Sequence, residues 1–388
     1  MPASASSSYP EYNSLQIRPA LTRRIIMNNI QRRRIVCALA VAPFSMPALQ
    51  AAAQGVAKMP SLHTGRLLLT SNLKTPPVGA TLAVDIVGDL PHKSGYTINS
   101  WFVIGHFESR GHTLNYLVHL LAISIKRVIV AVDSAVSITD ETTGWYGVQH
   151  NVYPIFRASV SSDQMLIKTP NSEVSGTLDD MRVRAQIKNA SIDVNLIATG
   201  YPLYNKGTGR FDLLGMDVHQ YSIPTLQTVG HVIIDGRKFP AAGESWFDRQ
   251  WQSQPLGPPK GRWTWMDLNL SNGWRISLWD AVAEDGKLLA WVTMIDGDGT
   301  HTVIDMVPLI EDASDFWLST STRCRYPTRW RVLVPGLDMQ LEVVAMPQEQ
   351  EVNGLSARYE GAASVTGWVR GGKVSGYTYV EMVGDWSA

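Results

Sequence analysis

The sequence predicts an all-β fold organised as two tandem antiparallel β-barrels or sandwiches. From about residue 80 onward, short runs of β-branched and aromatic residues alternate with Gly, Asn and Asp turn signals. No amphipathic helical period of useful length accompanies them. A length of 388 residues favours two domains, each with its own core, over one.

The composition argues against nucleic acid and anionic membranes as binding partners. Lys plus Arg and Asp plus Glu are both 34, so no net charge recruits nucleic acid or an anionic membrane. Apolar residues reach 45% and charged residues 18%, which is typical of a globular chain. Seven of the 13 tryptophans fall within one stretch of the second half, which indicates an aromatic-lined cavity or an aromatic core. They are Trp246, Trp251, Trp263, Trp265, Trp274, Trp279 and Trp291.

The N-terminal segment resembles a targeting signal. Arg32, Arg33 and Arg34 precede an apolar run over residues 35–44, and small residues at 51–53 would allow cleavage before Gln54. We therefore expect residues 1–53 to be a twin-arginine or general secretory signal peptide, with translation starting at Met1 or Met27. This predicts a periplasmic or secreted protein; the alternative is a disordered basic arm on a cytoplasmic one. The apolar run is too short to span a bilayer, so no integral membrane segment is expected in the mature chain.

Cysteine usage excludes two kinds of cross-link. Cys37 lies in the segment that would be removed, which leaves Cys324 alone. The mature chain can then form no internal disulfide, and a cysteine-based metal site is excluded by count. No other metal site and no cofactor is signalled, and the sequence says nothing about oligomeric state.

Turn signals place the domain boundary and the hairpins. The segment around residues 221–230 carries Pro224 between two strand-rich halves, so we expect domains over residues 60–225 and 226–388. Two-residue primed turns are predicted at Asp235-Gly236, Asn272-Gly273 and Asp285-Gly286, because both central positions of such turns need positive φ. Consecutive hairpins of this kind form a meander.

The turn positions also predict a register for residues 263–293. Counting outward from two-residue turns, Trp265 and Trp291 both come opposite Asp280, which places a carboxylate between two tryptophans. One interpretation is an apolar lumen whose polar points are Asp267 and Asp280. The alternative is that both carboxylates are paired structural groups, as most buried carboxylates are.

Three segments carry a family resemblance. Residues 219–224, 230–236 and 243–251 (HQYSIP, GHVIIDG and GESWFDRQW) resemble the central signature of the lipocalin-like carotenoid 1,2-hydratase and AttH family. Residues 100–107 and the segments 358–362 and 376–381 are similar to its flanking motifs, so the resemblance covers roughly residues 80–388. It implies two lipocalin-like barrels and chemistry on lipophilic polyenes, isoprenoids or polyketides, either by hydration or by pericyclic ring closure.

The resemblance also implies roles for particular residues. In the hydratases the implied site residues are a His, an aromatic residue two positions later, and an aromatic-x-Asp pair. These positions fall here on His219, Tyr221, Trp246 and Asp248. The Tyr and the Trp are exchanged relative to the carotenoid hydratase pattern. That exchange moves a hydroxyl and puts carotenoid hydration itself in doubt. His106 and Glu381 belong to flanking motifs, and structural pairing is the only role we expect for them. No Gly-x-Ser-x-Gly elbow or metal-ligand helix supports hydrolysis.

Hydrating an isolated alkene requires protonation of carbon by a neutral carboxylic acid in a water-poor site. Asp248 is the candidate acid and His219 the group that positions or deprotonates water. Aromatic faces would stabilise the cation and line the site. The candidate substrate-binding residues are Tyr221, Trp246, Trp251, Trp263, Trp265 and Asp280.

Two functions remain open at this point. The first is a cofactor-independent hydratase or cyclase acting on an apolar unsaturated substrate. The second is an exported carrier of a lipid-like ligand without turnover. For the residues themselves, the competing interpretation is an interdomain network built from Asp248 and Arg249, with His219 as a buried polar tie.

Overall fold

The computed structural model describes residues 81–253, 261–309, 312–353, 358–384 and 386. The predicted signal peptide lies outside these residues. Apart from short 3-10 turns at Ile155–Arg157, Asn205–Gly207 and Pro335–Leu337, the regular structure described is β-strand, which confirms the all-β prediction. Within the same ranges, no helix is long and apolar enough to cross a membrane.

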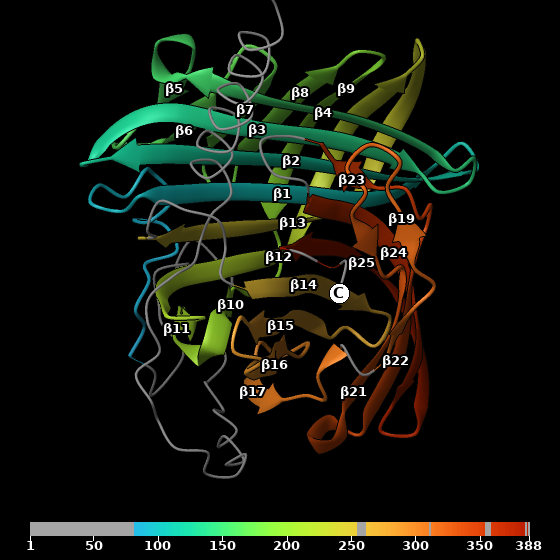
Figure 1. Cartoon of the computed structure of the whole chain (residues 1–388). Helices are drawn as coiled ribbons and strands as arrows, with labels where there is room; N and C mark the ends of the chain where they lie inside the picture. The colour runs from blue at the N-terminus through green and yellow to red at the C-terminus, as the bar shows by residue number, and fades with distance from the viewer. Residues whose placement is uncertain (1–80, 254–260, 310–311, 354–357, 385, 387–388) are drawn as a thin grey trace, which may run out of the picture.

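Two curled antiparallel sheets make up the molecule, and a two-stranded ribbon, β19 (Trp317–Leu318) with β20 (Arg325–Tyr326), lies beside them (Figure 1). The first sheet follows the order β4-β3-β2-β1-β13-β12-β9-β8-β7-β6-β5, and β10 and β11 also pair with β12. Its strands are β1 (Ile98–Ser109), β2 (His112–Ile125), β3 (Val128–Asp140), β4 (Trp145–Pro154), β5 (Ser159–Val160), β6 (Met165–Lys168), β7 (Ser172–Gly176), β8 (Met181–Ile187), β9 (Ala190–Ala198), β10 (Leu203–Tyr204), β11 (Arg210–Leu213), β12 (Met216–Ile234) and β13 (Arg237–Gln252).

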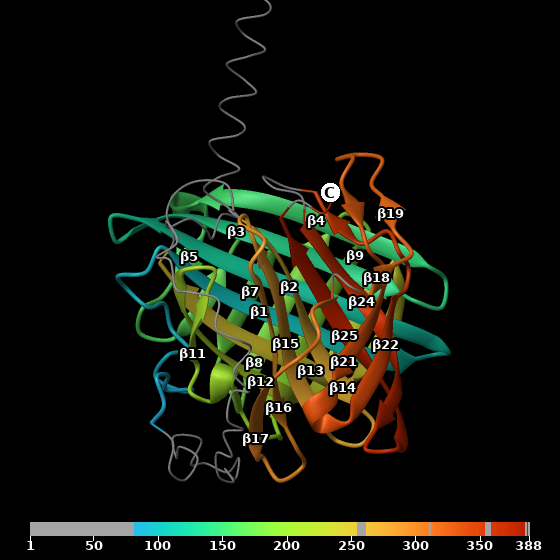
Figure 2. The same ribbon diagram turned by 60° about the horizontal axis from the view of Figure 1, so that its bottom comes forward.

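The second sheet follows the order β17-β16-β15-β14-β25-β24-β22-β21-β18, and β23 pairs with β24. Its strands are β14 (Gly261–Leu270), β15 (Arg275–Ala283), β16 (Leu288–Ile295), β17 (His301–Asp305), β18 (Ala313–Ser314), β21 (Arg329–Val334), β22 (Met339–Ala345), β23 (Glu351–Val352), β24 (Arg358–Val369) and β25 (Gly372–Val383). Among them, β14, β15 and β25 pack against β1 and β2 of the first sheet (Figure 2).

Three apolar cores follow from this arrangement. One fills the concave side of the first sheet and contains Trp101, Tyr221 and Trp251. Another fills the second sheet around Trp330. The third lies between the sheets and joins β1, β2 and β13 to β14, β15 and β25. Because residues alternate between the two faces of a strand, the same strands supply a barrel core and the inter-sheet core.

The hairpin at Asp235-Gly236 has the predicted geometry. Ile234 pairs with Arg237, and the two turn residues have φ of 48° and 79°, as a type I′ turn requires. The predictions for the next two hairpins were wrong by one residue. Leu270 bonds to Trp274 and Ala283 bonds to Lys287 across three-residue loops, in which Gly273 and Gly286 supply the positive φ.

The extra turn residue moves Asp280 to the other face of β15. Asp280 pairs with Thr264 and Ala290, whereas Trp279 lies opposite Trp265 and Trp291. A one-residue shift reverses the face of every side chain in the strand. Asp280 therefore does not lie between two tryptophans: its Oδ1 accepts the backbone N–H of Leu309 at 3.2 Å, and burial raises its pKa to about 6.

Residue 225, where the domain boundary was expected, lies inside β12. Pro224 sits at the register shift between Ile223 and Leu226, where a residue without an N–H costs no ladder bond. The proline that suggested a linker thus marks a bulge in a long strand. The chain passes from the first sheet to the second later, between the end of β13 at Gln252 and the start of β14 at Gly261.

His301 joins the sheets at a buried position. Its Nε2 accepts a hydrogen bond from the backbone N–H of Tyr204 at 3.0 Å, and its Nδ1 donates to the Gly299 carbonyl at 3.2 Å. Only the neutral ring can accept and donate in this way. Burial lowers the pKa of His301 to about 4.

We expect His301→Phe to lower the free energy of unfolding by about 1–3 kcal/mol at pH 7, because the Tyr204 N–H loses its acceptor. The wild-type contribution is complete above pH 6.5, the unperturbed value, and is lost as pH falls towards 4, since the unfolded chain binds the proton more readily. Urea unfolding at pH 7 and pH 5 should therefore give a smaller difference between variant and wild type at pH 5. An equal difference in unfolding free energy between variant and wild type at both pH values would contradict the assignment of a neutral His301 ring.

Candidate active site

A pocket lies between the two sheets and is lined by residues of both. One part of its wall is apolar and aromatic, with Phe102, Trp263, Trp265 and Trp279. The other part is polar and titratable, with His119, Gln220, Asp248, Gln250, Arg358 and Glu381. A mostly apolar cleft with a few converging polar groups is the usual form of a small-molecule site.

Asp248 is a buried carboxyl group in the pocket wall. Its Oδ1 accepts Trp246 Nε1–H at 2.7 Å, and its Oδ2 accepts Gln220 Nε2–H at 2.9 Å. Burial, with a smaller contribution from the Glu381 charge, raises the pKa of Asp248 to about 7. Rotating the Gln220 amide would present its Oε1, which accepts no bond from any residue in the described ranges, to a protonated Asp248. The site can therefore hold this carboxyl group in either protonation state.

Asp248, Phe102 and His119 form a row across three neighbouring strands. Phe102 of β1 pairs with Asp248 of β13 on one side and with His119 of β2 on the other. Directly opposite residues share a face, so all three side chains point to the second sheet. Two strand spacings separate the Cα atoms of Asp248 and His119 by about 10 Å. A flat ligand over Phe102 would have a titratable group at each side.

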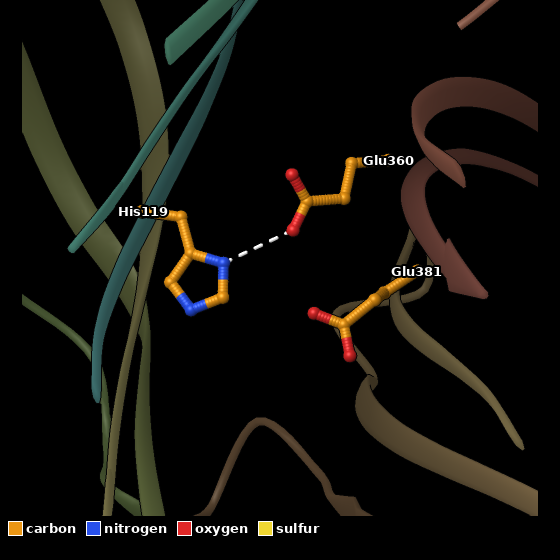
Figure 3. A group of neighbouring side chains, drawn as sticks. All are labelled: His119, Glu360 and Glu381. Carbon is orange, nitrogen blue, oxygen red and sulfur yellow. Dashed lines mark hydrogen bonds and ion pairs between the residues drawn. The ribbon is translucent and has the colours of Figure 1, made fainter. Parts of the chain in front are cut away.

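His119 connects the sheets through Glu360 on β24, and Glu381 on β25 lies near them (Figure 3). Its Nδ1 lies 3.0 Å from Glu360 Oε1, and its Nε2 lies 3.0 Å from Ser100 Oγ. Arg358 Nε–H donates to the same Glu360 oxygen at 2.8 Å. Glu381 accepts Trp263 Nε1–H at 3.0 Å.

The two glutamates differ in charge state. Burial opposes the ionisation of Glu360, but the Arg358 charge and the hydrogen bond with His119 outweigh it and hold the pKa of Glu360 well below its ordinary value. Burial, and then the Glu360 carboxylate, raise the pKa of Glu381. The carboxylate beside His119 is thus ionised behind the pocket wall, whereas Glu381, which lines the pocket, favours its neutral form.

His119, Glu360 and Glu381 also have the composition of a cation site, since one ligand atom from each lies within 4.8 Å of the others. However, the Glu360 oxygen that faces His119 already accepts from the Arg358 guanidinium. A cation would have to share this oxygen with a fixed positive charge. The geometry favours a hydrogen-bonding and proton-exchange network over a metal centre.

The structure divides the predicted site residues between two faces. Trp263, Trp265 and Asp248 line the pocket, and Trp246 lies beside them as a hydrogen-bond donor to Asp248. His219, Tyr221 and Trp251 are on the opposite face of β12 and β13, because the register places Gln220 and Gln250 on the pocket side. His219 stacks on Trp251 with ring centroids 5.3 Å apart, and the Tyr221 hydroxyl donates to the Ile86 carbonyl at 3.0 Å.

The interdomain network expected from Asp248, Arg249 and His219 does not form. Asp248 faces the pocket, whereas Arg249 faces the core of the first sheet and bonds to Asp89, Pro91 and Asn99. Asp267, the other carboxylate expected in the lumen, is buried between the sheets and accepts the backbone N–H of Tyr379. Burial raises its pKa well above the ordinary value.

Sequence reasoning missed His119, Arg358 and Glu360. His119 had a detectable signal, since it is the only titratable residue in the otherwise apolar run over residues 117–123. Arg358 and Glu360 lie within a flanking motif, but the contact of Glu360 with His119 joins residues 241 positions apart and depends on how the sheets pack. No local pattern reveals such a contact.

Curated relatives include enzymes of water addition and removal. The chain is 28% identical to dehydratase asqC of Emericella nidulans over 216 residues, which are 52% of this chain and 61% of that protein. It is 26% identical to kievitone hydratase of Fusarium solani subsp. phaseoli over 224 residues, which are 55% of this chain and 62% of that protein. The matched part thus spans less than two thirds of each relative.

Two solved structures share the fold. A structure from Nitrosomonas europaea assigned as AttH gives a TM-score of 0.67 at 21% identity and covers 80% of this chain and 100% of its own. Kievitone hydratase from Nectria haematococca gives a TM-score of 0.70 at 21% identity, with 84% and 100% covered. These confirm the predicted fold class. A family model described as AttH-like matches residues 80–385, and the chain therefore belongs to the AttH-like family.

Proposed function

We propose that this protein is an enzyme that adds water to, or removes water from, a carbon–carbon double bond of a small apolar molecule held between the two sheets. The observation that carries this proposal is Asp248, a buried carboxyl group whose pKa is raised to about 7 beside an aromatic wall. A hydratase and a dehydratase among the curated relatives support the same class of reaction.

The proposed chemistry divides between the two sides of the row across β13, β1 and β2. Neutral Asp248 gives its proton to one carbon of the double bond, and Trp265 and Phe102 offer aromatic faces to the developing positive charge. His119 takes the proton of the water that attacks the neighbouring carbon. His119 thus has the role expected for His219, and Glu360 and Ser100 fix the orientation of its ring. Proton transfer of this kind needs no cofactor.

Labelled water tests this proposal directly. The protein should co-purify from its own host with ligands that differ by the mass of one water molecule, visible by native mass spectrometry. Incubation in oxygen-18 water should place one labelled oxygen in the heavier ligand, because the reversible reaction exchanges it with solvent. A single ligand that never acquires label would overturn the proposal and leave a carrier of an apolar molecule, the second function that the sequence left open.

A further inference from the structure

Arg358 has unused hydrogen-bonding capacity at the pocket wall. Only its Nε donates a short bond, to Glu360 at 2.8 Å. Both terminal nitrogens, Nη1 and Nη2, are buried and donate to no residue among those the structure describes. The nearest carboxylate oxygen to Nη2, on Asp133, is 3.8 Å away, which is too long for a hydrogen bond.

Unpaired donors of this kind select among ligands. A buried N–H without an acceptor costs about as much as a lost hydrogen bond, and more when the donor is charged. A pure hydrocarbon in the pocket would leave both terminal nitrogens of Arg358 without an acceptor. A ligand with an oxygen at that point would recover the lost bonds, so the site rejects the one and retains the other.

The charges around Arg358 determine which type of ligand oxygen suits this position. Glu360 is ionised beside the guanidinium, and Asp133, which also contacts His150 at 2.7 Å, lies behind it. The positive charge is thus already balanced, and an additional anion would meet two carboxylates. A neutral oxygen with two lone pairs and no proton of its own is the matching partner. That is a carbonyl oxygen.

We propose that Arg358 receives a carbonyl oxygen of the substrate, so that the natural ligand is an oxygenated molecule such as a ketone, and not a hydrocarbon polyene. The inference rests on the proposed function only in taking the pocket as the substrate site. Asp248 lies on β13 of the first sheet and Arg358 on β24 of the second, so the carbonyl end and the protonated carbon occupy different walls. The polar contact would fix which end of the substrate meets Asp248.

Benzophenone and diphenylmethane form a matched pair of probes, because they share two phenyl rings and differ only in one carbonyl group. Quenching of the pocket tryptophans measures the binding of each. Wild type should bind benzophenone more tightly than diphenylmethane, although the latter is the more hydrophobic. In Arg358→Lys, which keeps the charge beside Glu360 but loses the guanidinium fork, benzophenone affinity should fall about tenfold. Diphenylmethane affinity should change less than twofold.

Arg329→Lys is the control: the Arg329 side chain pairs with Asp315 and Glu342 outside the pocket, so this substitution should alter neither affinity. Wild-type preference for diphenylmethane, or equal loss of both probes in Arg358→Lys, would overturn the assignment. If Arg358→Lys fails to fold, the wild-type order of the two probes still decides. Neither measurement requires turnover, so failure of the proposed reaction and failure of the carbonyl site give different results.

Discussion

Asp248→Asn will lower the rate of water addition or removal by about 10²–10⁴-fold, the range that general acid catalysis contributes. An amide cannot protonate carbon, but it has the shape of the carboxyl group and can keep both neighbours. Its oxygen accepts from Trp246, and its nitrogen donates to Gln220 once that amide rotates, because Gln220 Oε1 has no other partner in the described chain. The variant should therefore fold and bind ligand as wild type does.

The pH profile separates loss of the acid from a general disturbance of the pocket. Only protonated Asp248 is competent for water addition, and burial raises its pKa to about 7, so the wild-type rate of water addition should fall about tenfold per unit above pH 7. The residual activity of Asp248→Asn should lack this fall. Gln252→Glu exchanges an amide for a carboxyl group at another position of the same pocket wall, and serves as a control for altered charge in the pocket. A wild-type rate that stays constant from pH 6 to pH 9 would remove Asp248 from the role of acid.

Local sequence patterns predict the strands but not every register. Asp235-Gly236 forms the two-residue turn that its dipeptide indicates, yet Asn272-Gly273 and Asp285-Gly286 each close a three-residue loop. The same dipeptides fit both turns, because the longer loop needs positive φ only at its glycine. One residue of difference at the turn transfers Asp280 from the pocket side to the core of the second sheet.

The same limit explains which site residues could be found. The spacing of Trp246 and Asp248 places both on one face of β13, and the motif does predict that they lie together. The spacing of His219 and Tyr221 also places them on one face, but the motif does not say which. His119 reaches the site only through the pairing of β1 with β2 and the packing of β24 against them. That information belongs to the assembled sheets.

Arg249→Met will lower the free energy of unfolding by about 3–5 kcal/mol, the largest stability effect that we expect in this chain. The guanidinium is fully buried between Trp101 and Trp251, with 4.3 and 5.0 Å from its carbon to the ring centroids. It donates to the carbonyls of Asp89 and Pro91 at 2.9 and 2.7 Å. Burial lowers its pKa to about 10, so it remains charged at neutral pH.

Methionine can fill the space between the two indoles but leaves those carbonyls without donors. The segment around Asp89 and Pro91 should then detach first, since Arg249 bonds it to β13. Urea unfolding measures the loss, and hydrogen exchange at residues 85–93 locates it.

Arg249→Lys should recover little, because one ammonium cannot replace a fork of five donors. Arg329→Met, which breaks only the surface ion pairs with Asp315 and Glu342, should cost less than about 1 kcal/mol. Equal losses in Arg249→Met and Arg329→Met would show that Arg249 packs as a hydrophobic stem and that its hydrogen bonds do not hold the segment.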